Sequence, residues 1–501
     1  MDDKQGNALL SVSEMGRADQ LTIDYGIAGH DLMEAAGLSV VRHIMARYSP
    51  QKVLVLCGPG NNGGDGFVVA RHLAQAGWGV DLVLLGEVSN LRGDAAVMAA
   101  CYPGKIQPIG TAVLRDHGLI VDAIFGAGLC RSIEGDVAQL INQINTAECS
   151  LVAVDVPSGV DGDSGQVRGV ALQATSTVTF FRRKPGHLLY PGRALCGELE
   201  VTDIGILPRV LNEINPLTWR NDPALWRESF PRHTATGHKY SRGHGVVISG
   251  GAAQGGAARL AAKAALRIGA GLVSITCPED AIIPHAAHLT AVMIKPFSGR
   301  GDIKELLQDQ RLNAWCVGPG NGVTDRTGGY VLDIVGAGRA CVIDADGLTV
   351  FAPDPDKLFQ LTRKAARMPV LTPHDGEFYR LFPDLGSGTE GYNKLLSARE
   401  AAKRAGAVIL LKGPDTVIAA PDGRAVINDI APPWLATAGS GDVLAGLCMG
   451  LMAQGMPAFE AAAAAVWCHS RAAMAFGPGL ISEEIEGQIP AALKEIYTVN
   501  F

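Results

Sequence analysis

The feature that most limits the possible folds of this chain is a recurring unit. A short apolar run leads into a turn rich in glycine or aspartate, and apolar residues at helical spacing follow. In the first half, the run Lys52–Cys57 enters the turn Gly58–Gly66, and a second run, Val80–Leu85, comes after the helical pattern. A strand, a crossover and a strand require a parallel sheet. The unit recurs in the second half, so we predict an α/β protein of two doubly wound domains. Before the first run, helical spacing predicts one helix from about Ser13 to Tyr48.

The chain has 501 residues, which is long for one hydrophobic core. Between about Leu207 and Thr236 the periodicity fades and prolines become frequent, a composition typical of a linker. We therefore predict domains of residues 1–218 and 219–501. Trp219 and Trp226 leave a second interpretation open, in which this segment packs against one domain.

Composition excludes several classes of protein. A net charge of −7 argues against a general nucleic-acid binder, which needs a basic face. The ten cysteines are scattered without a C-x-x-C pair, as expected of buried thiols in a reducing compartment. The first residues lack the order of a signal peptide, and no apolar run approaches the roughly 18–20 residues of a membrane span. We expect a cytoplasmic protein without a membrane or nucleic-acid partner.

Polar residues stand at the carboxyl ends of three predicted strands in the first half. The sequence Asn61–Gly66 follows the first strand, Asp122 lies near the end of the second, and Asp155 and Ser158 end the third. These ends meet at one edge of a parallel sheet, so we expect Asn62, Asp122, Asp155 and Ser158 to converge on one crevice. Asparagine offers both an acceptor oxygen and an amide donor, which allows a cation and a phosphate to be held together. Each aspartate alone is also compatible with a simple loop cap.

The stretch Thr437–Gly446 is where we predict the main chemistry of the second half. Gly439 and Gly441 permit a tight turn, and the helix that follows presents free amides suited to a phosphate. Asp442 stands at that positive end, where a carboxylate is favoured and can take a proton from a hydroxyl. The alternative is a glycine turn with Asp442 as its cap. The loop Lys412–Thr416 follows another strand, and its lysine and backbone can meet nucleotide phosphates, as phosphoryl transfer requires.

Five motifs of the first half carry a family resemblance. They are Asn61–Gly66, Val121–Gly126, Val154–Gly159, Lys184–Gly186 and Asp203–Ile206. The region from about Ser13 to Leu207 resembles the Rossmann-like epimerase domain of the NAD(P)H-hydrate repair enzymes. The resemblance implies a potassium ion held by Asn62, Asp122 and Ser158. It also implies these ligands of the hydrated nucleotide: Asn61, Asn62, Gly63, Gly64, Asp65, Gly126, Ala127, Gly128, Leu129, Cys130, Arg131, Ser132 and Asp155.

The reaction that this resemblance implies is inversion at C6 of the hydrated nicotinamide ring, from the R to the S epimer. We assign proton transfer to Asp155 as a hypothesis. The alternative role for Asp155 is orientation of the ligand only.

The second half, from about Trp226 to Tyr497, resembles the ADP- or ATP-dependent NAD(P)H-hydrate dehydratases of the ribokinase-like superfamily. The matching elements are Ala264–Val273, Val317–Gly322, Leu371–Glu377, Lys412–Thr416 and Thr437–Gly446. By resemblance, the substrate contacts are Ala257, Gly320, His374 and Asp442. The nucleotide contacts are Lys412, Gly413, Pro414, Asp415, Thr416 and Gly441. The implied reaction phosphorylates the C6 hydroxyl and then expels phosphate, with Asp442 as the base and Mg²⁺ bound with the nucleotide; the fused arrangement favours ADP.

The leading hypothesis is therefore one bifunctional repair enzyme acting on hydrated NADH and NADPH with ADP or ATP. A small-molecule kinase, such as a hydroxymethylpyrimidine kinase, fused to a nucleotide-binding module is the main alternative. A non-catalytic nucleotide sensor is the third. We also expect a homo-oligomer, with alanine-rich helices such as Ala458–Ala475 as candidate subunit contacts.

Overall fold

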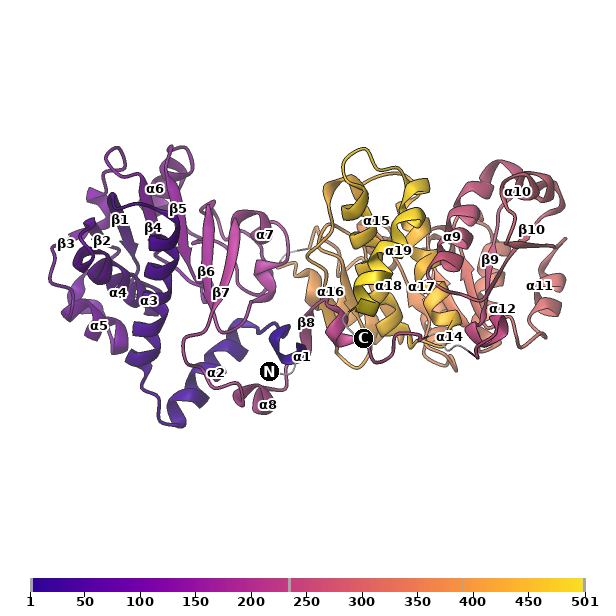
Figure 1. Ribbon diagram of the computed structural model, residues 1–501, viewed down its shortest axis with the longest axis horizontal. Coiled ribbons are helices and arrows are strands. Elements are labelled where there is room, and N and C mark those ends of the chain that lie inside the picture. The colour runs from indigo at the N-terminus through magenta and orange to yellow at the C-terminus, as the bar shows by residue number, and fades with distance from the viewer. Residues whose placement is uncertain (1–2, 233–235, 390, 499–501) are drawn as a thin grey trace. The chain divides into compact units, whose positions relative to one another are not determined.

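The computed structural model describes residues 3–232, 236–389 and 391–498. Contacts divide the chain into two compact units, which we call unit 1 (Met1–Thr218) and unit 2 (Trp219–Phe501). Each unit contains one sheet covered by helices (Figure 1). The predicted α/β class, with a mainly parallel sheet in each half, is confirmed.

The sheet of unit 1 has the order β3-β2-β1-β4-β5-β6-β7, and all its pairs are parallel. Its strands are β1 (Lys52–Cys57), β2 (Gly79–Leu84), β3 (Ile106–Pro108), β4 (Leu119–Ala123), β5 (Ser150–Val154), β6 (Ser176–Phe180) and β7 (Glu198–Thr202). Its helices are α1 (Asp3–Gly6), α2 (Val12–Asp24), α3 (Gly29–Arg47), α4 (Asn61–Gln75), α5 (Gly93–Ala100), α6 (Gly135–Asn145), α7 (Gly192–Leu195) and α8 (Val210–Ile214). The order reverses between β1 and β4, which opens a crevice beyond the carboxyl ends of these strands.

Two predicted boundaries in unit 1 are wrong. The single helix expected over Ser13–Tyr48 is two helices, α2 and α3, because the chain turns at Gly26 with a φ of 98°. The glycine-rich segment after β1 is also not an open turn, since α4 already begins at Asn61. A Cβ on Gly66 would lie 2.7 Å from the Cβ of Ala123. Glycine is therefore needed here for close packing of the helix on the sheet.

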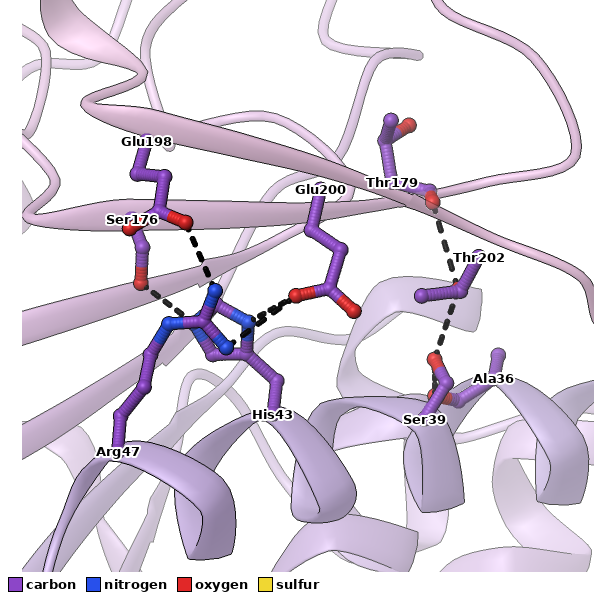
Figure 2. A network of polar contacts seen from close by, with 9 residues as sticks. All are labelled: Ala36, Ser39, His43, Arg47, Ser176, Thr179, Glu198, Glu200 and Thr202. Atoms are coloured by element: carbon purple, nitrogen blue, oxygen red, sulfur yellow. Dashed lines mark hydrogen bonds and ion pairs between the residues drawn. The ribbon is translucent and has the colours of Figure 1, made fainter.

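A polar network fastens α3 to strands β6 and β7 (Figure 2). The buried His43 ring lies 2.7 Å from Glu200 Oε2 through Nδ1 and 2.8 Å from Ser176 Oγ through Nε2. Arg47, one turn later, donates to Glu198 at 2.8 Å. A buried polar side chain is tolerated only when it is hydrogen-bonded, and both ring nitrogens of His43 are. The network fixes α3, whose other end helps to form the crevice.

The sheet of unit 2 has the order β11-β10-β9-β12-β13-β14-β15-β16-β17-β8. Its strands are β8 (Thr218–Arg220), β9 (His244–Ile248), β10 (Leu272–Cys277), β11 (Met293–Pro296), β12 (Ala314–Val317), β13 (Ala340–Ile343), β14 (Val370–Leu371), β15 (Val408–Leu411), β16 (Val417–Ala419) and β17 (Ala425–Ile427). The strands from β11 to β15 pair in parallel, whereas β15, β16 and β17 pair antiparallel.

The helices of unit 2 pack tightly through small residues. They are α9 (Gly255–Arg267), α10 (Ile282–His288), α11 (Arg300–Leu306), α12 (Asp325–Gly336), α13 (Asp346–Thr349), α14 (Pro355–Thr362), α15 (Asp375–Leu381), α16 (Lys394–Ala405), α17 (Ser440–Ala453), α18 (Ala458–Phe476) and α19 (Ser482–Thr498). Figure 1 shows α9, α17, α18 and α19 side by side. A Cβ on Gly446 of α17 would lie 2.1 Å from the Ala261 carbonyl of α9, so glycine sets this separation. Most alanines of α18 are buried inside unit 2, whereas Ala475 is exposed, so only part of this helix is open to the expected subunit contact.

The segment between the two predicted domains is not an open linker over its described part. Trp226 is buried, and its ring centroid lies 5.9 Å from that of Trp467. Its Nε1 donates to Asn221 Oδ1 at 3.2 Å, and Asn221 N–H donates to the Ile427 carbonyl of β17. The tryptophan therefore packs the segment against unit 2, as the second interpretation proposed. Thr234 and its two neighbours lie outside the described residues.

Two further observations concern the cysteines and the length of the apolar helices. All ten cysteines are free, and most are buried. No helix within the described ranges is long and apolar enough to cross a membrane.

Candidate functional site

A cavity of about 610 Å³ lies at the crevice of unit 1. Its walls come from α2, α3 and the start of α4, and from the segments that follow β1, β4 and β5. The predicted ligands that line it are Asn61, Asn62, Asp65, Gly126, Ala127, Gly128, Leu129, Cys130, Arg131 and Asp155. Gly63, Gly64 and Ser132 are not among its lining residues, and the two glycines are buried in the first turn of α4.

Asp122 and Ser158, two of the three predicted metal ligands, are in direct contact. Ser158 donates to Asp122 from its hydroxyl at 2.6 Å and from its backbone N–H at 2.7 Å. Both side chains are fully buried. Burial raises the pKa of Asp122 to about 6, although the hydrogen bonds from Ser158 oppose that rise.

Asn62, the third predicted metal ligand, lies in the first turn of α4 and contacts the segments at the ends of β4 and β5. Its side-chain amide donates to the Val154 carbonyl at 3.1 Å and accepts from the Gly126 N–H at 3.3 Å. Within the described ranges there is no group of three or more His, Cys, Asp or Glu residues suited to a metal. The oxygens of a carboxylate, a hydroxyl and an amide are nevertheless the donors that a hard cation such as K⁺ takes. The donor chemistry of Asn62, Asp122 and Ser158 therefore fits the ion.

Asp155 is held by a lysine that was not predicted as a site residue. Lys184 Nζ lies 2.5 Å from Asp155 Oδ1, and Thr179 Oγ1 donates to the same oxygen at 3.0 Å. Ala127 N–H donates to Oδ2 at 3.2 Å. Burial raises the pKa of this carboxyl, but the charge and hydrogen bond of Lys184 outweigh burial and lower it. Asp155 is therefore ionised and fixed, at a backbone φ of 67°.

The charges of Asp155 and Lys184 also act on two further carboxyls, those of Asp65 and Asp19. Burial raises the pKa of Asp65 well above its usual value, and the charges of Asp155 and Asp19 raise it further. Asp19 lines the cavity from α2, and burial raises its pKa to about 6 against the opposing charge of Lys184. Three carboxyls thus share one ammonium group. Asp19 was not predicted, because α2 lies far from any strand end in the sequence.

The predicted site of unit 2 lies around the start of α17. Gly439 turns the chain with a φ of 88°, and α17 begins at Ser440. The N–H groups of Asp442 and Val443 donate back to the Gly439 carbonyl, at 3.1 Å and 3.2 Å. Burial raises the pKa of Asp442 to about 6; the charge of Asp344 raises it and that of Lys412 lowers it. A carboxyl with this pKa can act as a base near neutral pH.

Lys412 lies beside the start of α17. Its Nζ is 2.8 Å from Asp344 Oδ1 and 3.8 Å from Glu377 Oε2. A Cβ on Gly441 would lie 3.6 Å from the same nitrogen. Burial lowers the pKa of Lys412, but the two carboxylates outweigh burial and raise it. Lys412, Gly441 and Asp442 are therefore brought together, along with Asp344, which follows β13 and was not predicted as a site residue.

The rest of the Lys412–Thr416 segment is an ordered loop. Thr416 Oγ1 donates to the Gly413 carbonyl at 2.7 Å and accepts from its N–H at 3.2 Å. Asp415 is buried in an ion pair with Lys394, whose Nζ lies 2.6 Å from Oδ1. Backbone groups of the loop, rather than the Asp415 carboxylate, are thus the groups that can meet a nucleotide.

The other predicted substrate contacts lie on loops or at a helix start that follow strands of the same sheet. His374 caps α15, because its Nδ1 accepts from Gly376 N–H at 3.0 Å, and its imidazole is 56% exposed. Gly320 follows β12 with a φ of 67°, and its carbonyl lies 1.9 Å from the position of a Cβ on Gly250. Ala257 is half-buried in the first turn of α9. The capping bond explains His374 without a ligand, so its contact with substrate stays a prediction.

Comparison with known proteins covers both units. A family model described as NAD(P)H-hydrate dehydratase matches residues 246–481, and one described as YjeF-related protein N-terminus matches residues 29–186. The chain is 37% identical to a bifunctional NAD(P)H-hydrate repair enzyme of Salinibacter ruber, over 97% of this chain and 96% of that protein. It is 38% identical to the same enzyme of Moorella thermoacetica, over 93% of this chain and 91% of that protein.

One solved structure bears on the fold of unit 2. It is a ribokinase-like superfamily protein from Enterococcus faecalis, with a TM-score of 0.50 and 23% identity. The match covers 56% of this chain and 96% of that protein. The predicted ribokinase-like fold of the second half is confirmed.

Proposed function

This chain belongs to the family of bifunctional NAD(P)H-hydrate repair enzymes, and we propose that its two units catalyse consecutive steps of the repair. Unit 1, the epimerase domain, converts the R epimer of hydrated NADH or NADPH into the S epimer. Unit 2, the dehydratase domain, removes water from the S epimer with ADP as the co-substrate. The observation that supports this division is that each unit has its own aspartate and lysine at the carboxyl ends of its parallel strands, Asp155 with Lys184 in unit 1 and Asp442 near Lys412 in unit 2.

In unit 1 the hydrated nucleotide binds in the cavity beyond β1, β4 and β5. We assign its binding to the lining residues of α4 and of the segment Gly126–Ser132. Asp155 serves as the proton-transfer group. The contact with Lys184 supports this role, because it keeps the carboxylate ionised and able to accept the proton of the C6 hydroxyl.

Potassium is the cation we propose for Asn62, Asp122 and Ser158. The support is a fully buried carboxylate whose described partners are the hydrogen-bond donors of Ser158 and Ile124. A buried carboxylate is costly unless a charge compensates it, and a bound cation supplies that charge beside the nucleotide. Exchange of K⁺ for a bulky organic cation should therefore slow epimerisation of the R epimer and leave dehydration of the S epimer unchanged.

In unit 2, Asp442 takes the proton of the C6 hydroxyl while the oxygen attacks the terminal phosphate of the nucleotide. Lys412 and the amides at the start of α17, including Gly441, neutralise charge on the transferring group. Phosphate then leaves from C6 while a proton passes from C5 to solvent, which restores the C5=C6 double bond of the dihydronicotinamide. A hydroxyl is a poor leaving group and a phosphate is a good one, which is why a kinase-like fold suits a dehydratase. We expect Mg²⁺ to bind together with the nucleotide.

Incubation of the purified S epimer of NADH hydrate with the full chain, and with ADP or ATP, tests this proposal. Return of the NADH absorbance supports dehydration, and the faster nucleotide identifies the co-substrate. A stable phosphorylated product supports a small-molecule kinase instead. Nucleotide binding without either product supports a sensor.

Cytoplasmic location and assembly into a homo-oligomer are the remaining proposals. The buried, unpaired thiols are compatible with a reducing compartment. Light scattering on the purified chain measures its oligomeric state directly.

A further inference from the structure

One face of α2 forms a wall of the unit 1 cavity. Its cavity-lining residues are Val12, Met15, Gly16, Asp19 and Ile23. They recur every three or four positions, so they form a single stripe along the helix. Asp19 is the one charged member of that stripe. An acidic side chain on an otherwise apolar wall is costly to bury, so its place there calls for a reason beyond packing.

The surroundings of Asp19 differ from those of Asp155. Asp155 has three donors on its carboxylate, from Lys184, Thr179 and Ala127. In the described ranges, no group hydrogen-bonds the Asp19 carboxyl, so both its oxygens are available to a ligand in the cavity. Lys184 and Asp155 nevertheless act on Asp19 electrostatically, which places all three groups in one field.

The charges near each carboxyl separate the roles of Asp155, Asp19 and Asp65. Lys184 neutralises Asp155, to which it is bonded, and no second ammonium group acts on Asp19 or Asp65 among the described residues. Burial and the charge of Asp155 favour the protonated form of Asp19. Two carboxyls whose pKa values are pushed apart are the usual arrangement for an acid and a base in one site. Asp65 is buried in α4, and its pKa is raised further than that of Asp19, so its ionised form is harder to reach. Asp19 is therefore the better candidate to exchange a proton with the substrate.

We propose that Asp19 is the second proton-transfer group of unit 1 and works as the acid while Asp155 works as the base. This inference rests on the proposed epimerase function. Asp155 removes the proton of the C6 hydroxyl, the C6–N1 bond breaks to give a C6 aldehyde, and its electron pair goes to N1. Asp19 delivers its proton to N1. After rotation about C5–C6, N1 attacks the other face of C6 and returns its proton to Asp19. Asp155 returns its proton to the oxygen, so both carboxyls end as they began.

Replacement of Asp19 by asparagine tests the proposal, because the amide keeps the shape of the side chain but cannot transfer a proton. In full-length protein, D19N should lower kcat for the R epimer by about 100-fold or more. Dehydration of the S epimer in unit 2 should not change and serves as an internal control. D24N is the matched variant, since Asp24 lies on the same helix, is exposed and pairs with Gln20; it should keep wild-type epimerisation.

The pH profile separates proton transfer from a structural role. In wild-type protein the alkaline limb should report loss of the Asp19 proton, under the influence of Lys184, Asp155 and Asp65. Helix α8 packs on α2, and its residue Glu213 and the preceding Arg209 contact Tyr25, which follows the C-terminal end of α2. The alkaline limb should be absent from the profile of D19N. The kcat of D19E for the R epimer should be at least tenfold higher than that of D19N.

Each outcome has a definite meaning. Wild-type protein that fails to convert the R epimer overturns the epimerase function and this inference together. A wild-type enzyme that converts it, combined with a D19N variant within threefold of wild type or with its alkaline limb intact, overturns only the role of Asp19.

Discussion

The ammonium group of Lys184 lies 2.5 Å from the Oδ1 atom of Asp155. The two residues follow different strands, β6 and β5, and meet at the wall of the unit 1 cavity. The lysine keeps the carboxylate ionised despite burial, so the availability of a base in this unit depends on a residue 29 positions away in the sequence.

Lys184→Met should raise the pKa of Asp155, because the lysine is what holds that pKa below its usual value. The sign follows directly: a base with a higher pKa loses its ionised form at higher pH. The acid limb of the R-epimer profile should therefore shift to higher pH, and the rate at neutral pH should fall. K105M removes an exposed lysine of the same unit and should leave the profile unchanged. An unshifted acid limb in K184M would contradict this account of the pair.

The dehydration catalysed by unit 2 should depend on pH through Asp442. Its pKa is raised to about 6, so the carboxylate is present above that pH and is protonated below it. The kcat for the S epimer with ADP should fall as pH decreases through about 6. D442N should lower kcat by about 10²–10⁴-fold at every pH and abolish this limb. D422N, at an exposed aspartate paired with Arg424, is the control.

The buried pair Lys394–Asp415 should stabilise unit 2. Both side chains are less than 10% exposed, at 8% and 6%. Lys394→Met leaves a buried carboxylate without its ammonium partner, a change that costs about 3–5 kcal/mol in comparable pairs. Urea unfolding should show that loss in unit 2. Lys403 is an exposed lysine on the same helix, α16, and K403M should unfold as wild type does; equal midpoints for the two variants would refute the assignment.

Close backbone packing against Ile124, a residue that lines the cavity, should make Gly58 irreplaceable. A Cβ at this position would lie 1.8 Å from the Ile124 carbonyl oxygen, and backbone cannot yield as a side chain does. Gly58→Ala should lower the free energy of unfolding of unit 1 by roughly 1–3 kcal/mol or more. Its unfolding temperature should fall accordingly. Gly60→Ala is the matched variant, because no atom lies within 4 Å of its added Cβ. Similar melting of the two variants would show that the backbone relaxes freely.

The sequence identified those site residues that lie near the end of a buried strand or directly follow it. Asp122, Asp155 and Lys412 were found in this way, because apolar runs mark strands and parallel strands end at one edge. Lys184 and Asp344 also end or follow strands, but neither carried a glycine-rich turn to mark it. Lys184 stood in a motif that supported the family resemblance, and that motif was the signal available.

Asp19 could not be predicted from the positions of strand ends. It belongs to a helix, and only the three-dimensional packing of α2 turns its stripe toward the cavity. The helix boundary at Asn61 was missed for a related reason. Glycines in sequence favour a turn, whereas here they let α4 approach β1 and β4 more closely than any other residue would.

The central claim, that two sites act in succession on one damaged coenzyme, is tested most directly by following the pure R epimer of NADH hydrate with ADP. We predict that D155N forms no NADH from the R epimer at an enzymatic rate but converts the S epimer as wild type does. D442N should convert R into S and stop there. Recovery of NADH from the R epimer by D155N at the wild-type rate, or loss of both activities in either single variant that remains folded, would contradict the claim.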